Sequence, residues 1–112
     1  MTEPAPAAYM VKEIETIAEG GDMRARLYTL ARDDVIPWHW HSAVTDWYFC
    51  LAGTLRIETR APHADQRIAV GGHYAILPKT AHRISNGGHA EDCRFLLLQG
   101  VGAYDFNKVK DG

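Results

Sequence analysis

The chain has 112 residues, of which 46% are hydrophobic and 23% charged, a balance typical of one globular domain rather than of a disordered, collagen-like or membrane protein. Twelve Lys and Arg residues oppose fourteen Asp and Glu residues, and no basic run could neutralise a row of phosphates, so we expect no nucleic-acid partner. The apolar runs are far shorter than the ~20 residues of a membrane helix, and residues 1–8 lack a signal-peptide core, which predicts a cytoplasmic protein without a membrane partner.

The N-terminal part of the chain predicts an arm followed by two strands. Residues 1–8 contain two prolines and several alanines and are interpreted as a flexible arm, which leaves residues 9–112 as the folded domain. The amphipathic residues 9–17 could pair as an edge strand. After a Gly-Gly-Asp turn, the side chains of residues 23–31 fall into two alternating rows with a period of two residues, which predicts a second strand.

Short β-rich segments bounded by Gly, Pro, Asn and Asp continue along the chain. We predict strands at residues 36–41, 46–51, 54–60, 66–70, 74–77, 82–85 and 93–98. Many short strands at regular spacing indicate an all-β sandwich or barrel. The two cysteines, Cys50 and Cys93, lie inside such strands, where free thiols pack like small hydrophobic groups.

Two of the six histidines form the strongest local signal. His39 and His41 flank one residue, and on a strand the side chains of such a pair leave the same face. After the four residues that follow His41, Asp46 begins the next predicted strand. A hairpin between the two strands would bring its carboxylate beside the imidazoles.

A third imidazole, His82, stands at the head of a later predicted strand. Three nitrogens and one oxygen on a concave face suit Fe(II), Mn, Ni, Zn or Cu and leave coordination positions open. The alternative is that these histidines end strands and bond to backbone carbonyls. His63, His73 and His89 have turn-like neighbours, so we expect them to be solvated.

The segment around the histidine pair resembles the first motif of the cupin superfamily, G(x)5HxH(x)3-4E(x)6G. His39 and His41 supply the two histidines, Asp46 stands at the glutamate position and Gly53 is the final glycine. The motif is similar in spacing, with two departures: Asp33 replaces the first glycine, and Asp46 has a shorter side chain than glutamate.

The second cupin motif, G(x)5PxG(x)2H(x)3N, is similar to Gly72, Pro78, His82 and Asn86 at their spacings. Here Thr80 replaces the middle glycine, and one residue fewer precedes the histidine. The two motifs cover about a third of the chain, and the remaining predicted strands match a small cupin of the cupin-2 type in number and length.

The resemblance implies an all-β, single-domain cupin, a double-stranded β-helix or jelly-roll barrel. It also implies one divalent transition metal per chain, Fe, Mn, Ni or Zn, held by His39, His41, His82 and Asp46. A metal-dependent, dioxygenase-like enzyme acting on a small polar organic substrate is the first functional hypothesis. The alternatives are a non-catalytic small-molecule-binding or sensor protein, and a redox-neutral isomerase or lyase.

Side chains near the histidines have alternative roles. Asp46 could bind the metal directly or hold a ligand imidazole, which would leave a three-histidine site. By alternation Tyr48 and Cys50 point into the barrel, and Ile84 follows His82 on its face, so these three could line a substrate pocket or pack in the core. Three tryptophans close to the motif, together with the amphipathic residues 9–17, favour a homodimer.

Overall fold

The computed structural model describes residues 9–88 and 90–109, so the predicted arm at residues 1–8 and the predicted solvated His89 lie outside the described residues. Within these ranges the chain forms ten strands. They are β1 (Glu13–Glu19), β2 (Met23–Leu30), β3 (Val35–Trp40), β4 (Thr45–Ala52), β5 (Leu55–Thr59), β6 (Ala64–Ile68), β7 (His73–Ile76), β8 (His82–Asn86), β9 (Cys93–Gly100) and β10 (Asn107–Lys108). In this part of the chain, no helix is both long and apolar enough to cross a membrane.

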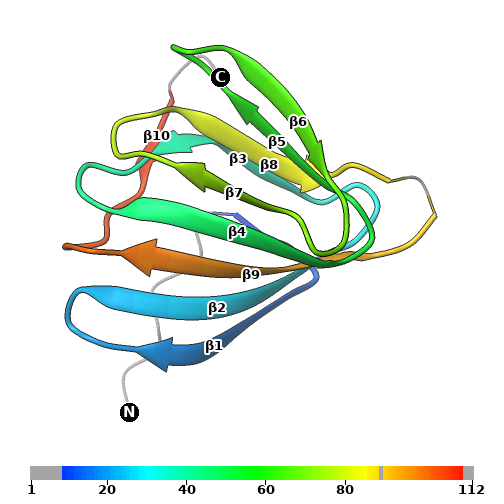
Figure 1. Cartoon of the computed structure of the whole chain (residues 1–112), viewed down its shortest axis with the longest axis horizontal. Helices are drawn as coiled ribbons and strands as arrows, with labels where there is room; N and C mark the ends of the chain where they lie inside the picture. Colours follow the sequence, from blue (N-terminus) through cyan, green and yellow to red (C-terminus); the bar gives the residue numbers. More distant parts are fainter. Residues whose placement is uncertain (1–8, 89, 110–112) are drawn as a thin grey trace.

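The strands form two antiparallel sheets that face each other across the core (Figure 1). One five-stranded sheet has the order β1-β2-β9-β4-β7, and the other has the order β10-β3-β8-β5-β6. The hairpin expected between the strands of His39 and Asp46 is wrong, because β3 and β4 belong to different sheets and do not pair. Their connection at one end of the barrel instead spans both layers. This is the all-β jelly-roll barrel that the sequence predicts.

Two predicted strands are displaced by two residues or more, the other predicted strands differ by at most two residues at either end, and one observed strand is not predicted. The first strand covers Glu13–Glu19 rather than residues 9–17, because the chain before it turns inward: the Tyr9 hydroxyl bonds to that of Tyr28 at 2.9 Å. The strand expected at residues 66–70 lies two residues earlier, at Ala64–Ile68. The short strand β10, which pairs with β3, has too few residues to give a periodic signal.

Strict alternation along the central strands builds the core. In β4 every second residue from Asp46 to Cys50 is buried, whereas Trp47 and Phe49 are half-buried on the outer side. The aromatic rings of Tyr28 and Phe95 are directly opposed in β2 and β9 and stack with centroids 4.9 Å apart. Cross-strand pairs of this kind stabilise a sheet and fix its register.

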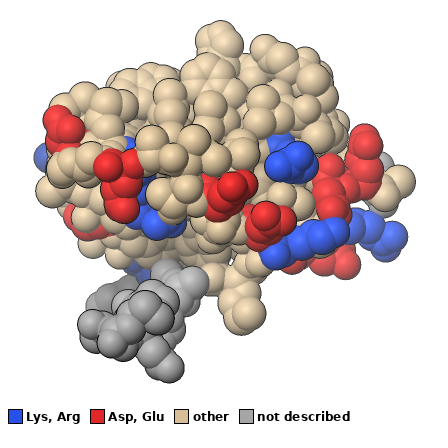
Figure 2. All heavy atoms as spheres, turned by 90° about the horizontal axis from the view of Figure 1, so that it is seen from below, with Lys and Arg blue, Asp and Glu red and all other residues tan. Residues whose placement is uncertain are grey.

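Acidic and basic side chains are interspersed on the face shown in Figure 2, and a broad upper stretch of that view carries no charge. Elsewhere on the surface, charges pair with each other, as in the bidentate contact of Arg56 on β5 with Asp65 on β6. Such exposed pairs contribute little to stability.

Candidate metal centre

The ends of three strands bring the predicted ligands together. His39 lies near the end of β3 and His41 directly follows that strand, whereas His82 begins β8 and is the Cα partner of His39. Asp46, near the start of β4, completes the group from the other sheet. One donor atom from each of the four residues lies within 4.8 Å of all the others, and all four residues are buried.

Each imidazole of the centre is oriented by a backbone carbonyl. The Nδ1 atoms of His39, His41 and His82 lie 2.7, 2.6 and 2.8 Å from the carbonyl oxygens of Pro37, Asp105 and Thr80. A carbonyl oxygen can only accept, so Nδ1 carries the proton in each contact and Nε2 is left with a free lone pair unless the ring is charged. The backbone contacts expected for structural histidines are therefore present, but they occupy only one nitrogen of each ring.

The remaining ring nitrogens face a carboxylate. The Nε2 atoms of His41 and His82 lie 3.1 and 3.2 Å from Oδ2 of Asp46. Within the described residues, the buried Nε2 of His82 makes no hydrogen bond. Two lone pairs directed at an anionic oxygen repel it unless a cation or a proton lies between them. The donor set therefore fits a divalent metal, and nitrogen and carboxylate ligands of this kind suit Fe, Mn, Ni and Zn.

Asp46 is fully buried and is held from both sides. The Tyr48 hydroxyl donates to Oδ2 at 2.9 Å, and the side-chain amide of Gln99 donates to Oδ1 at 3.0 Å. Burial raises the pKa of Asp46, but its contacts with His41 and His82 outweigh burial and hold that pKa below its usual range. Burial and the charge of Asp46 raise the pKa of Tyr48, which keeps the phenol protonated as a donor.

Two of the imidazoles have opposite tendencies to take up a proton. Burial, followed by the neighbouring His82, lowers the pKa of His39 to about 3, so this ring is neutral and ready to bind a metal at neutral pH. Burial also lowers the pKa of His41, but the hydrogen bond and charge of Asp46 reverse that effect and raise it overall. In the absence of a metal, a proton on His41 would therefore neutralise Asp46.

Sequence reasoning missed the C-terminal segment that covers the centre. The ring of Phe106 stacks on His39 with centroids 4.3 Å apart, and the ring of Tyr104 lies 5.3 Å from that of His41. Asp105 supplies the carbonyl for His41, and its carboxylate is anchored by the backbone N–H of Ser42 at 2.8 Å. No periodic pattern predicts this segment, because it crosses the end of the barrel instead of extending a sheet.

The missed Gln99 did carry a signal. It shares its row on β9 with the buried Cys93, Phe95 and Leu97, and a polar side chain in such a row needs a partner. The predicted strand ended one residue earlier, at residue 98. The buried amide of Gln99 therefore lies just beyond the strand that the sequence predicts.

The other predicted site residues lie in or near the core. Tyr48 contacts Asp46, whereas Cys50 and Ile84 pack among the apolar core residues. Their assignment to substrate binding stays a prediction. His63 and His73 are both exposed and take no part in the group, although His73 begins β7 and does not lie in a turn.

Comparisons with known proteins identify the fold. No protein-family model and no curated protein matches the sequence. A conserved double-stranded β-helix protein from Klebsiella pneumoniae is similar in structure, with a TM-score of 0.75, 16% identity, and coverage of 97% of this chain and 85% of that chain. For a cupin-2 domain protein from Shewanella frigidimarina the TM-score is 0.65, the identity 21%, and the coverage 81% and 82%.

An enzyme is also among the similar structures. The oxalate decarboxylase of Lactobacillus farciminis, solved with formate, has a TM-score of 0.77 and 16% identity, and the match covers 96% of this chain and 34% of that one. At such identities the likeness concerns the fold. The chain has the cupin fold, and its buried His-His-Asp-His group could bind a metal.

Proposed function

We propose that this protein is a metal-dependent enzyme that binds one divalent transition metal per chain through His39, His41, His82 and Asp46 and acts on a small polar organic substrate. The observation that supports it most directly is the orientation of the imidazoles: every Nδ1 contacts a backbone carbonyl, and two of the Nε2 atoms face Asp46. Outer hydrogen bonds of this kind fix the tautomer and the direction of metal-binding histidines.

The residues around the group have separate tasks. A bound metal would supply Lewis acidity or oxygen chemistry and would keep open positions for small molecules. Tyr48 and Gln99 hold the two carboxylate oxygens of Asp46. Phe106 and Tyr104 cover His39 and His41 and exclude water from that side.

Dioxygenase-like chemistry is the first candidate reaction. It is supported by a donor set rich in histidine, which suits Fe(II) and leaves room for both a substrate and O₂. Redox-neutral cleavage or isomerisation is the second candidate. It is supported by the likeness in fold to an oxalate decarboxylase. A non-catalytic binding protein would have the same pocket without turnover.

Metal analysis tests the proposal first. Untagged protein reconstituted separately with Fe(II), Mn, Ni and Zn should retain close to one ion per chain in elemental analysis after desalting. His82→Ala should lose most of that metal, because it removes one ligand, whereas the exposed His63→Ala should match the wild type. Wild-type protein that retains hardly any of the four metals would contradict the proposal.

Oxygen-electrode measurements then separate the reaction classes. Fe(II)-loaded protein should consume oxygen with a diketone, a thiol acid or a hydroxylated aromatic acid, with His82→Ala as the inactive control. Turnover with Mn or Zn in the absence of oxygen would instead support the redox-neutral class. Tight binding of a metabolite without any turnover would support the non-catalytic alternative.

A further inference from the structure

Two arginines belong to the inward-facing row of β2. Arg24 and Arg26 alternate with the same period as Tyr28 and Leu30, which are 1% and 0% exposed and belong to the core. Both arginines are half-buried. Their partners on β9 are Gln99 for Arg24 and Leu97 for Arg26, and both of these are buried. The row therefore extends the barrel interior toward the end that carries the metal ligands.

Among the half-buried basic residues that the structure describes, these two arginines are the ones without an acidic partner. Arg56, Arg83 and Lys12 all form ion pairs, but neither Arg24 nor Arg26 forms one with any residue in the ranges described. Among those residues, the buried Nε of Arg26 also finds no hydrogen-bond acceptor. A cation in such surroundings is costly unless an anion or an acceptor joins it.

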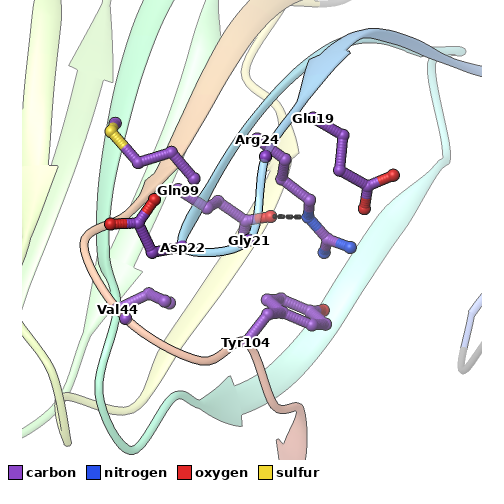
Figure 3. Close-up of a pocket in the computed structure, with 10 residues that line it drawn as sticks. Glu19, Gly21, Asp22, Arg24, Val44, Gln99 and Tyr104 are labelled. Carbon is purple, nitrogen blue, oxygen red and sulfur yellow. Dashed lines mark hydrogen bonds between the residues drawn. The ribbon is translucent and has the colours of Figure 1, made fainter.

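Arg24 borders a cavity of about 110 Å³ and is held in a defined position there. Its Nε donates to Oε1 of Gln99 at 2.8 Å, and its guanidinium carbon lies 3.5 Å from the ring centroid of Tyr104 (Figure 3). These contacts use the Nε atom and one face of the guanidinium group. The two terminal nitrogens remain for a planar acceptor, which a carboxylate matches with two parallel hydrogen bonds.

The cavity adjoins the candidate metal centre through two of its lining residues. Gln99 receives the hydrogen bond of Arg24 and itself donates to Oδ1 of Asp46. Tyr104 packs between the guanidinium of Arg24 and the ring of His41. A small molecule anchored at Arg24 would therefore lie one side chain away from the metal ligands.

Two acidic residues also line the cavity, but they do not neutralise Arg24. Glu19 and Asp22 lie on either side of the turn between β1 and β2, and both are exposed, so water and salt screen their charges. In Figure 3 the carboxylate of Asp22 points away from the guanidinium group, whereas that of Glu19 lies on the same side as the guanidinium group but forms no ion pair with it.

We propose that Arg24 and Arg26 bind a carboxylate group of the substrate, which would make this substrate a small organic acid. The inference rests on the proposed function, which supplies the metal centre as the reactive site, and it adds the chemical class of the substrate. Arg24 forms the bidentate contact, and Arg26, two residues further along the same row, contributes the second positive charge.

Binding measurements with matched probes test this assignment. Acetate, succinate and benzoate are each titrated calorimetrically into metal-free and metal-loaded protein, alongside the corresponding uncharged amides. At least one acid should bind more tightly than its amide in both forms. Arg24→Met should weaken that binding about tenfold or more, as expected for the loss of charge-assisted hydrogen bonds. Arg26→Met removes a positive charge at a residue that does not line the cavity, and it should weaken the binding less than Arg24→Met.

Two further variants serve as controls. Arg24→Lys keeps the charge but loses the bidentate geometry, and it should fall between the wild type and Arg24→Met. Arg94→Met removes an exposed arginine from the neighbouring strand β9 and should bind like the wild type. Circular dichroism identifies any variant that fails to fold.

Two results would overturn the inference: no acid preferred over its amide by the wild-type protein, or unchanged preference in the folded double variant Arg24→Met/Arg26→Met. Because the titrations include the metal-free protein, both results can be obtained whether or not the protein retains a metal. Arginine-dependent binding of an acid by a protein that retains no metal would refute the proposed function alone.

Discussion

At the scale of single residues, Asp46 is the residue on which the centre depends. Its carboxylate is fully buried, and four side chains contact it: His41, His82, Tyr48 and Gln99. An ionised carboxylate in such a place requires hydrogen-bond donors or a cation, and Tyr48 and Gln99 supply two donors. Oδ2 faces the two imidazoles, and Gln99 and Tyr48 hold the group in that direction.

Replacement of this carboxylate should weaken metal binding strongly. We expect Asp46→Ala to lower metal affinity by about 10 to 100-fold, whether Asp46 binds the ion directly or orients its histidine ligands. Competition with a chelator of known affinity measures the loss. His63→Ala, at an exposed histidine, is the control and should retain wild-type affinity. An equal loss in both variants would place the metal elsewhere.

At the scale of the elements, the turns determine whether the strands meet in register. Gly53, between β4 and β5, has a φ of +70°, and a Cβ there would lie 2.6 Å from the carbonyl oxygen of Asp92. Only glycine fits this combination of backbone angle and close approach. The final glycine of the first motif is thus required by the turn that follows β4.

Gly53→Ala should therefore destabilise the protein by about 1 to 3 kcal/mol, through the strained backbone and the contact with Asp92. Urea unfolding measures the free energy. Gly21→Ala is a suitable control, because its φ is not in the left-handed region and a Cβ there has nothing within 4 Å. Comparable loss of stability in both variants would argue against this role for Gly53.

At the scale of the whole molecule, the outer face of one sheet is apolar. Side chains that are directly opposed across β2, β9 and β4 form this outer face, and they are Ala25, Leu27, Leu96, Leu98, Trp47 and Phe49. All six are half-buried within one chain. Contiguous apolar faces of this kind are typical of protein interfaces.

A second copy of the chain is the partner we propose for this face. Light scattering should give about twice the chain mass of 12.5 kDa, the mass of a dimer. Dimers with twofold symmetry are the most common homo-oligomers. Leu98→Glu, in the middle of the face, should shift the protein toward the monomer. Val70→Glu, at a residue that is 63% exposed in the turn before β7, should leave the mass unchanged. A monomer mass over a wide concentration range would contradict the prediction.

Local patterns in the sequence determined most of the strands and the four candidate ligands. The period of two in β3 places His39 and His41 on one face whatever the rest of the chain does. The short spacing to Asp46 keeps it near them, although the connection crosses between the sheets and is not a hairpin. His82 needed the second motif, because it is distant in sequence and its place follows from pairing with β3.

Only the tertiary structure decided what surrounds those ligands. The same alternation that revealed β2 could not tell whether Arg24 and Arg26 face the core or the solvent, since this depends on packing against β9. Asp105 and Phe106 reach the histidines through a chain segment without periodicity. The physical reason is that side-chain alternation is a property of the local backbone, whereas register and the path of a crossing segment depend on contacts between residues far apart in sequence.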